Sequence, residues 1–300
     1  MALPHFIIAG APKCGTTALW AFLSQHPDIC MTSNKEPSFF SDDPGELEKP
    51  MSMMGSGDLH PGNYYRGLSW YESLFKHCQK TQVRGEATPR YFMGQNSASL
   101  IKSIVPQVKL IFLLRHPLEV MFSAYWQEHK PGLKLPDFVK MVTTNHPRFQ
   151  FYCRIISYQS NLEKYYKHFS DKQILVLLHA DLKQKPLETL QQIFEFIGVD
   201  KTFVPNNLEA QFNQRAIPRF RTLQRMLYSP MVVKLSKRMP VSLLPYLRPI
   251  RNAIRQLNLK ERKNSSSIPS SIRQQLIQSF EKDIVYVEKL LGRDLNAWRT

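Results

Sequence analysis

Short apolar runs, each followed by a helix-forming segment, recur along this chain. Residues 5–9 form the first run, and residues 18–23 beyond the connecting loop favour a helix. A second run at residues 108–114 leads into Pro117, which suits the first turn of a helix. Each of these patterns predicts a strand, a turn and then a helix.

A third apolar run, at residues 173–178, repeats the arrangement. Asp181 follows it as a candidate helix cap, and apolar residues then recur at helical spacing through residues 187–197. Gly198 marks the end of this helix, because glycine readily adopts the left-handed conformation of a C-cap.

Apolar strands that alternate with helices predict a parallel sheet with helices on both faces. We therefore expect an α/β fold with three layers, α/β/α, in a single domain over residues 1–300. Ligands of such sheets bind at the carboxyl ends of the strands. Residues 42–67, rich in Gly, Pro, Met and Ser, indicate a long loop or lid.

The last third of the chain has a different composition. Residues 215–263 carry 13 Lys and Arg residues against one acid, and five prolines divide them into short pieces. We expect a basic, Pro-interrupted helical segment there, followed by a polar linker at 265–271. Residues 270–291 predict an amphipathic helix that docks on the core. Its apolar positions are Ile272, Leu276, Phe280, Ile284, Val287 and Leu291.

The composition limits the structural class of the protein and the kinds of partner that it can bind. Hydrophobic residues make up 43% of the chain, which excludes disordered, collagen-like and coiled-coil classes. The 40 Lys and Arg residues against 24 Asp and Glu residues give a formal net charge of +16, which favours anionic partners. The sequence contains no zinc finger, RNP signature or KH loop, so we expect no nucleic-acid partner.

The cysteines and the apolar runs bear on location and metal binding. Four cysteines without CxxC spacing predict that the thiols are reduced. The sequence has no HExxH motif and no pair of CxxC motifs, so we expect no bound metal. The apolar stretch at residues 6–9 is too short for a signal-peptide core, and the run at 110–114 is far too short to span a membrane. We therefore expect a cytoplasmic protein.

The segment GAPKCGTT at residues 10–17 separates the first strand from its helix. Such a loop directs backbone N–H groups and a helix N-terminus at an anion, with Lys13 and two hydroxyls beside it. Nucleoside-triphosphate loops, Gly-x4-Gly-Lys-Ser/Thr, have lysine where Thr16 stands, and no apolar strand here ends in a magnesium-binding Asp. We predict a P-loop-like phosphate site that serves neither a kinase nor an NTPase; an ordinary turn with a chance lysine is the alternative.

The second strand offers a matching anion site. Arg115 follows the strand directly, and Ser123 comes early in the next helix. A guanidinium binds phosphate as a bidentate charged fork, and a hydroxyl adds a donor. Each residue alone is routine at its position, but together with the first loop they predict a second phosphate contact.

Five segments resemble the sulfotransferases that use 3′-phosphoadenosine 5′-phosphosulfate (PAPS). PKCGTTAL at residues 12–19 is similar to their 5′-phosphosulfate loop, and RHPLEVMFSAY at 115–125 resembles their 3′-phosphate motif. NKEPSFF at 34–40 and GEATPRY at 85–91 resemble the heparan-sulfate-type branch, and LGRDLNAW at 291–298 resembles bacterial members. The resemblance covers nearly the whole chain, in order.

The resemblance implies a metal-independent, in-line transfer of a sulfuryl group from PAPS, with adenosine 3′,5′-bisphosphate (PAP) as product. Lys13 then neutralises charge on the bridging oxygen, and Glu36 takes the proton of an acceptor hydroxyl or amine. Arg115 and Ser123 bind the 3′-phosphate. The other implied donor contacts are Cys14, Gly15, Thr16, Thr17 and Ala18 in the loop, and Arg215 and Arg219, with Asn213 and Arg221 as further candidates, after the last core strand.

Two residues are implied on the acceptor side, Glu86 and Gln127. Glu86 is either a second candidate acid or a brace of the site. Gln127 lies one helical turn beyond Ser123, and a solvated glutamine is the alternative for it. For Glu36 the alternative is a surface acid beside Lys35. We expect Cys14 to fill space rather than to act as a nucleophile, and His116 to have a structural role.

The acceptor itself stays open. Heparan-type members often carry a His at the position of Ser38 and a Lys at that of Ala87, so a small-molecule, lipid-like or carrier-bound acceptor is favoured over a heparan-like carbohydrate. The cations of residues 215–263 exceed what one cofactor needs and predict an acidic carrier protein or an anionic membrane as partner, or a solvated surface. The alternative function is a non-catalytic protein of nucleotide-binding fold whose basic face binds an acidic polymer or membrane.

Overall fold

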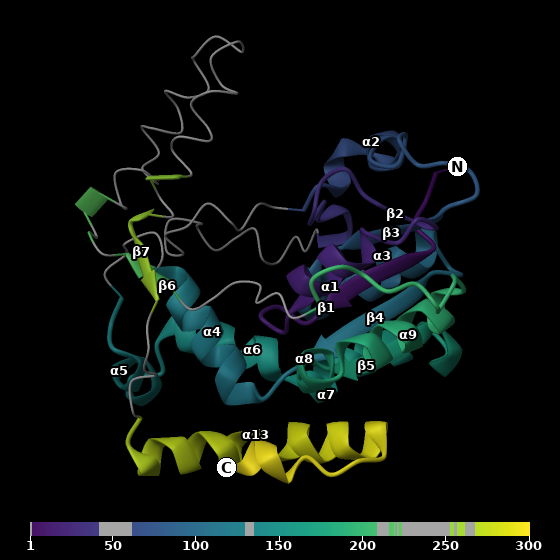
Figure 1. The fold of residues 1–300 in the computed structure, drawn as a ribbon. Coiled ribbons are helices and arrows are strands. Elements are labelled where there is room, and N and C mark those ends of the chain that lie inside the picture. Colours follow the sequence, from purple (N-terminus) through teal and green to yellow (C-terminus); the bar gives the residue numbers. More distant parts are fainter. Residues whose placement is uncertain are drawn as a thin grey trace.

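Five parallel strands form the central sheet of the computed structural model, in the order β2-β3-β1-β4-β5 (Figure 1). The strands are β1 (Phe6–Gly10), β2 (Ile29–Met31), β3 (Val83–Ala87), β4 (Lys109–Leu114) and β5 (Ile174–Leu178). The structure describes residues 2–41, 62–129, 135–208 and 268–300, together with 216–218, 220, 222–223, 253–254 and 257–261.

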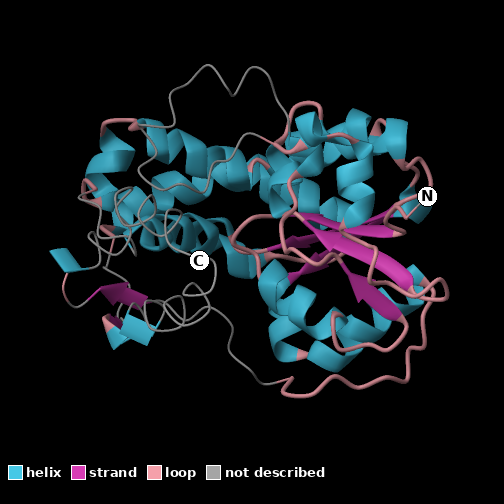
Figure 2. Cartoon of the chain, turned by 90° about the horizontal axis from the view of Figure 1, so that it is seen from above, coloured by secondary structure: helices cyan, strands magenta, loops and turns pink. Residues whose placement is uncertain are grey.

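Helices cover both faces of the sheet (Figure 2). On one face the end of α1 (Thr16–Leu23) lies near α9 (Pro186–Ile197), and the His26 ring is 4.8 Å from that of Phe194. On the other face Phe112 of β4 packs 4.7 Å from Tyr165 of α7 (Tyr158–Tyr166). Among the described residues, the other α-helices with given bounds are α2 (Leu68–Ser73), α3 (Ser97–Ile104), α4 (Pro117–His129), α5 (Phe138–Thr143), α6 (Pro147–Ile156), α8 (His179–Gln184) and α13 (Ser270–Leu291).

The three-layer α/β/α fold expected from the apolar pattern is confirmed. β1, β4 and β5 each lie within one residue of the predicted bounds, and Gly198 ends α9 in the left-handed conformation, at φ 84°. The prediction that Asp181 caps the helix after β5 is wrong, because α8 begins at His179 and Asp181 lies within its first turn. Asp181 instead forms an ion pair with Arg293, at 2.6 Å.

The basic segment, expected to be helical and interrupted by prolines, also contains two short strands. Among its described residues, β6 (Ala216–Pro218) pairs antiparallel with β7 (Leu259–Glu261). The buried Asn258 side chain accepts from Phe220 N at 2.9 Å and donates to Phe220 O at 3.0 Å. The paired strands are more than 40 residues apart in sequence, and the local spacing of apolar residues does not reveal such a distant pairing. Residues 42–61 of the expected lid and most of 215–263 lie outside the described residues.

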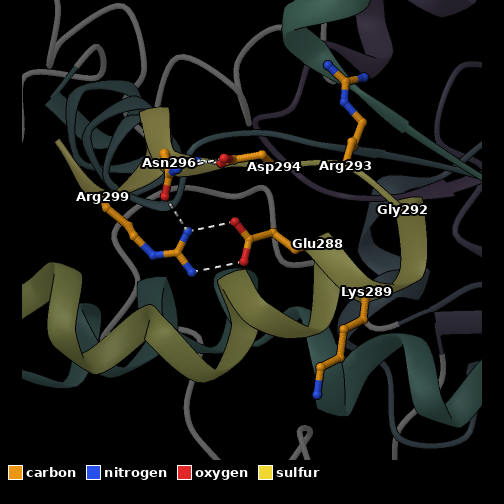
Figure 3. Close-up of a pocket in the computed structure, with 7 residues that line it drawn as sticks. All are labelled: Glu288, Lys289, Gly292, Arg293, Asp294, Asn296 and Arg299. Carbon is orange, nitrogen blue, oxygen red and sulfur yellow. Dashed lines mark hydrogen bonds and ion pairs between the residues drawn. The ribbon is translucent and has the colours of Figure 1, made fainter.

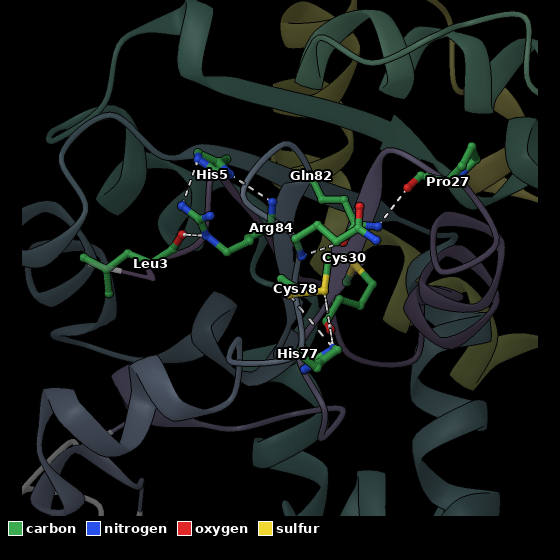
Figure 4. The surroundings of a disulfide bond; sticks show 10 residues. Leu3, His5, Pro27, Cys30, His77, Cys78, Gln82 and Arg84 are labelled. Carbon is green, nitrogen blue, oxygen red and sulfur yellow. Dashed lines mark hydrogen bonds between the residues drawn. A yellow bond between two sulfur atoms is a disulfide. The ribbon is translucent and has the colours of Figure 1, made fainter.

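The prediction that the cysteines are reduced is wrong for one pair. Cys30 of β2 and Cys78 form a disulfide, with Cα atoms 5.6 Å apart (Figure 4). His77 lies beside the bond, and its Nε2 is 3.1 Å from the Met31 carbonyl oxygen. The chain between the two cysteines returns to the edge strand, and their sequence spacing of 48 gives no sign of it. Cys14 and Cys153 are free.

The C-terminal helix α13 packs against α7, along the lower side of the molecule in Figure 1. It buries Leu276, Phe280 and Ile284 among other apolar side chains, and Gly292 ends it at φ 61°. Within the part of the chain that the structure describes, no helix combines the length and apolarity needed to cross a membrane.

Candidate active site

The loop after β1 is shaped for an anion. Gly15 precedes α1 at φ 97°, and Lys13 adopts φ 68°, which is uncommon for a residue with a side chain. Thr16 and Thr17 open α1, where backbone N–H groups have no partner within the helix. The helix N-terminus adds partial positive charge, so this loop suits a phosphate or sulfate.

Cys14 is a space-filling residue of this loop. It is completely buried, and burial raises the pKa of its thiol to about 12. A thiol of that pKa stays protonated near neutral pH, and the thiolate is the reactive form. The side chain therefore packs the loop against the core, as the sequence predicts.

Arg115 brings the exit of β4 to the same loop. Its guanidinium NH1 donates to the carbonyl oxygen of Lys13 at 3.4 Å, and its Nε contacts Glu119 at 2.7 Å. The Arg115 side chain keeps 18% of its surface exposed. The lysine and the arginine predicted to bind the donor therefore lie together, although they are about 100 residues apart in sequence.

His179 is a residue of this region that the sequence analysis missed. It is the first residue after β5, and a Cβ atom built on Gly15 would lie only 2.6 Å from its Cδ2. Burial lowers the pKa of His179 to about 4, with the Arg115 charge as a further cause. The imidazole is therefore neutral near pH 7. The rule that strand exits converge at one edge could have identified it, because it follows β5 as Arg115 follows β4.

The structure describes only some of the other residues predicted to bind the donor or the acceptor. Ser123 lies half-buried in the second turn of α4, the helix that begins two residues after Arg115, and Gln127 is exposed one turn further on. Ala18 lies half-buried in the first turn of α1. Arg215 and Arg219 lie outside the described residues, as do the further candidates Asn213 and Arg221.

Glu36 lies on a loop that is tied to the exit of β3. Its backbone N–H donates to the Ala87 carbonyl at 3.0 Å, and two residues later Ser38 N donates to Thr88 Oγ1 at 3.3 Å. Glu36 itself adopts φ 59°. Its carboxylate contacts Lys35 Nζ at 2.6 Å and keeps 43% of its side-chain surface exposed. The loop thus holds an accessible carboxylate at the sheet edge.

Glu86 is completely buried, and the hydroxyls of Tyr71 and Tyr91 interact with its carboxyl group without forming a hydrogen bond of ordinary geometry. Burial raises its pKa to about 8, while the neighbouring hydroxyls of Tyr71 and Tyr91 lower it in part. The absence of exposed surface favours the bracing alternative, and a contact of Glu86 with the acceptor stays a prediction. The Tyr91 hydroxyl accepts from Phe40 N at 3.2 Å, which places Glu86 beneath the loop that carries Glu36.

Two other groups of polar side chains lie apart from the phosphate loop and the Glu36 loop. Among the described residues, Cys30, His77 and Cys78 form a group of metal-ligand type, but both sulfur atoms are used in the disulfide. A pocket at the end of α13 is drawn in Figure 3, where Arg299 NH1 contacts Glu288 at 2.6 Å. None of the candidate donor or acceptor residues lines it.

Comparison with known proteins agrees with this arrangement. The family model of the sulfotransferase domain matches residues 3–232. The chain belongs to the sulfotransferase family. The matched range contains the phosphate loop, the Glu36 loop and Arg115, and it ends before α13.

Several sulfotransferases are similar to it. Heparan sulfate glucosamine 3-O-sulfotransferase 3B1 of Mus musculus is 28% identical over 217 residues, which is 71% of this chain and 50% of that protein. Bifunctional heparan sulfate N-deacetylase/N-sulfotransferase 4 of Mus musculus is 27% identical over 211 residues, 66% of this chain and 22% of that protein. The chain thus spans half or less of the length of these relatives.

A solved structure shares the fold. The sulfotransferase from Alicyclobacillus acidocaldarius superposes with a TM-score of 0.73 at 24% identity, over 100% of both chains. The match extends over the whole chain, including the C-terminal region beyond the family match.

Proposed function

We propose that this protein transfers the sulfuryl group of PAPS to a hydroxyl or amine. The observation that carries the proposal is a second cationic group beside the phosphate loop: Arg115 NH1 is 3.4 Å from the Lys13 carbonyl oxygen. Two anion-binding elements on adjacent strands suit a nucleotide with phosphates at both its 5′ and its 3′ positions. A nucleoside triphosphate, whose phosphates form one chain, needs only the loop.

In this proposal the phosphate loop, residues 10–17, binds the sulfuryl donor. The N–H groups at the start of α1 hold the 5′-phosphosulfate, and the Lys13 ammonium neutralises the charge that develops on the bridging oxygen as the sulfur–oxygen bond breaks. Arg115 and Ser123 hold the 3′-phosphate. PAP leaves with the bridging oxygen, and the sulfur forms its new bond to the acceptor oxygen or nitrogen.

In this proposal Glu36 acts on the acceptor. Its exposed carboxylate is the base that takes the acceptor proton as the new bond forms. Beside it, Asn63 donates to the Pro37 carbonyl at 2.8 Å and leads into Tyr64 and Tyr65, of which 38% and 76% of the surface is exposed. Exposed aromatic side chains on the segment that Asn63 ties to the Glu36 loop support an acceptor with a ring or another apolar body. The relatives named above include one O-sulfotransferase and one N-sulfotransferase, so both acceptor atoms are proposed.

The test is transfer of ³⁵S from labelled PAPS in the presence of EDTA to a panel of amphiphilic alcohols, amines and oligosaccharides. We expect a labelled product that the Lys13→Ala variant does not form and that Lys76→Ala, which changes an exposed lysine shortly after α2, still forms. If ATP with magnesium instead supports phosphoryl transfer to the panel while PAPS supports none, the proposal is wrong.

A further inference from the structure

Tyr158 occupies the space behind both phosphate-binding elements. It is the first residue of α7 and is completely buried, and its hydroxyl donates to the Arg115 carbonyl oxygen at 2.5 Å. The Cys14 thiol of the phosphate loop also lies at hydrogen-bonding range of the hydroxyl, which is one cause of the raised pKa of Tyr158 after burial. One side chain thus contacts the exits of both β1 and β4.

This contact complements the one made by Arg115 itself. The Arg115 guanidinium donates a hydrogen bond to the Lys13 carbonyl oxygen, while the Arg115 carbonyl oxygen accepts one from the Tyr158 hydroxyl. A buried phenol has two torsions and a ring locked by packing, so its hydroxyl is a fixed reference point. The backbone of Arg115 is therefore positioned by a group that touches no ligand.

Helix α13 in turn fixes Tyr158. Asp283 of α13 accepts from Gln159 N at 2.8 Å in the first turn of α7, where helix N–H groups lack internal partners. The Trp298 ring lies 5.9 Å from that of Tyr158. The C-terminal region beyond the family match therefore supports the donor site from behind.

We propose that Tyr158 is a positioning residue that sets the 3′-phosphate subsite against the 5′-phosphosulfate loop. The inference rests on the proposed function, because it assigns Arg115 to the 3′-phosphate of the donor product PAP. Without the hydroxyl, the Arg115 backbone loses one of its anchors, and the guanidinium is held less well at the distance that the two phosphates of one nucleotide require.

The experiment is a calorimetric titration of the full chain with PAP and with AMP, which lacks the 3′-phosphate. The ratio of the two affinities measures the 3′-phosphate preference. Tyr158→Phe keeps the ring and removes the hydroxyl, and it should reduce this preference about three- to tenfold, the range for the loss of one hydrogen bond. AMP affinity should change by a smaller factor.

Tyr165→Phe is the matched control. Tyr165 lies on the same helix, is equally buried, and donates to the Tyr91 carbonyl at 2.5 Å, but it touches neither phosphate element. Both variants lose a buried tyrosine-to-carbonyl hydrogen bond and a comparable amount of thermal stability. Only Tyr158→Phe should change the ratio of PAP to AMP affinity.

The outcomes separate the two proposals. A wild-type protein that binds PAP no better than AMP contradicts the proposed function itself. A wild-type preference that survives unchanged in Tyr158→Phe, or that falls equally in Tyr165→Phe, overturns the role of Tyr158. If Tyr158→Phe does not fold, Asp283→Ala is used instead, because it removes the acceptor of the Gln159 N–H in the first turn of α7. It should reduce the preference in the same direction, and an unchanged preference overturns the role.

Discussion

The two residues assigned to chemistry, Lys13 and Glu36, both adopt left-handed backbone conformations. Glycine or asparagine usually occupies such positions, because a side chain is strained there. Ser38, on the Glu36 loop, shares the feature. Strain of this kind persists only where the surroundings hold it, and it concentrates at functional sites. Here the Glu36 loop is held by hydrogen bonds from the exit of β3.

Glu36→Gln tests the base directly. The amide keeps the size of the side chain but does not accept a proton at neutral pH, so transfer should fall about 10²- to 10⁴-fold. PAP affinity should stay unchanged, because the proposed function gives Glu36 a role toward the acceptor and none toward the donor. Steady-state transfer and calorimetry measure the two quantities. Glu163→Gln on α7 is the control, and full activity in Glu36→Gln would remove Glu36 from the role of base.

Glu86 predicts a pH dependence of stability. In the unfolded chain a glutamate loses its proton near pH 4.5, whereas the folded chain keeps the Glu86 proton up to a pKa of about 8. The folded state binds more protons between these values, so this residue lowers the free energy of unfolding as pH rises, by about 1.4 kcal/mol per unit within the window.

Glu86→Gln should remove this contribution. Urea unfolding at pH 5.5 and at pH 7.5 measures it as the difference between wild type and variant. The variant should gain stability relative to wild type as the pH rises. A difference that is constant across the two pH values would mean that the Glu86 carboxyl titrates normally.

At the scale of elements, the phosphate loop depends on the close packing of Gly15 against His179. A Cβ at Gly15 would lie 2.6 Å from His179 Cδ2, and the position is left-handed at φ 97°. Gly15→Ala should lower the free energy of unfolding by about 1–3 kcal/mol and weaken PAP binding. Gly198→Ala is the control, because φ is 84° there and nothing lies within 4 Å. Equal PAP affinity in both variants would contradict the importance of this packing.

The disulfide is a second element-scale feature. It closes a loop with a sequence separation of 48, which in the chain-entropy account stabilises the fold by about 4 kcal/mol. We expect Cys78→Ser, or reduction by dithiothreitol, to lower the midpoint of chemical unfolding substantially. Cys153→Ser, which removes a free cysteine, should have a small effect. An unfolding curve that does not respond to reductant would show that the bond contributes little.

The apolar pattern predicted β1, β4 and β5 because these strands are continuous, buried runs. It did not predict β2 and β3, since β2 has only three residues and β3 contains Arg84, Gly85 and Glu86. The antiparallel pairing of β6 with β7 and the disulfide were missed for the same physical reason: both are set by distant contacts that no local periodicity encodes.

At the scale of the whole molecule, most of the candidate site was predictable because strand exits in a parallel sheet converge. Lys13, Arg115 and Glu36 follow different strands and were found by type and motif. His179 directly follows β5, so the convergence of strand exits could have identified it. Tyr158 was not predicted, because a single tyrosine carries no signal until its neighbours are known. The burial of Glu86 likewise follows from the helices and loops packed over β3, which the sequence does not place.

We propose that the molecule as a whole presents two anion sites at the spacing of one nucleotide with 3′- and 5′-phosphates. The most direct measurement is calorimetric titration with PAP, ADP and AMP in the absence of magnesium. We predict micromolar or tighter binding of PAP, weaker binding of ADP and AMP, and loss of the preference in Arg115→Ala, with Arg84→Ala at the start of β3 as control. Equal affinity for the three nucleotides, or binding that requires magnesium, would contradict the account.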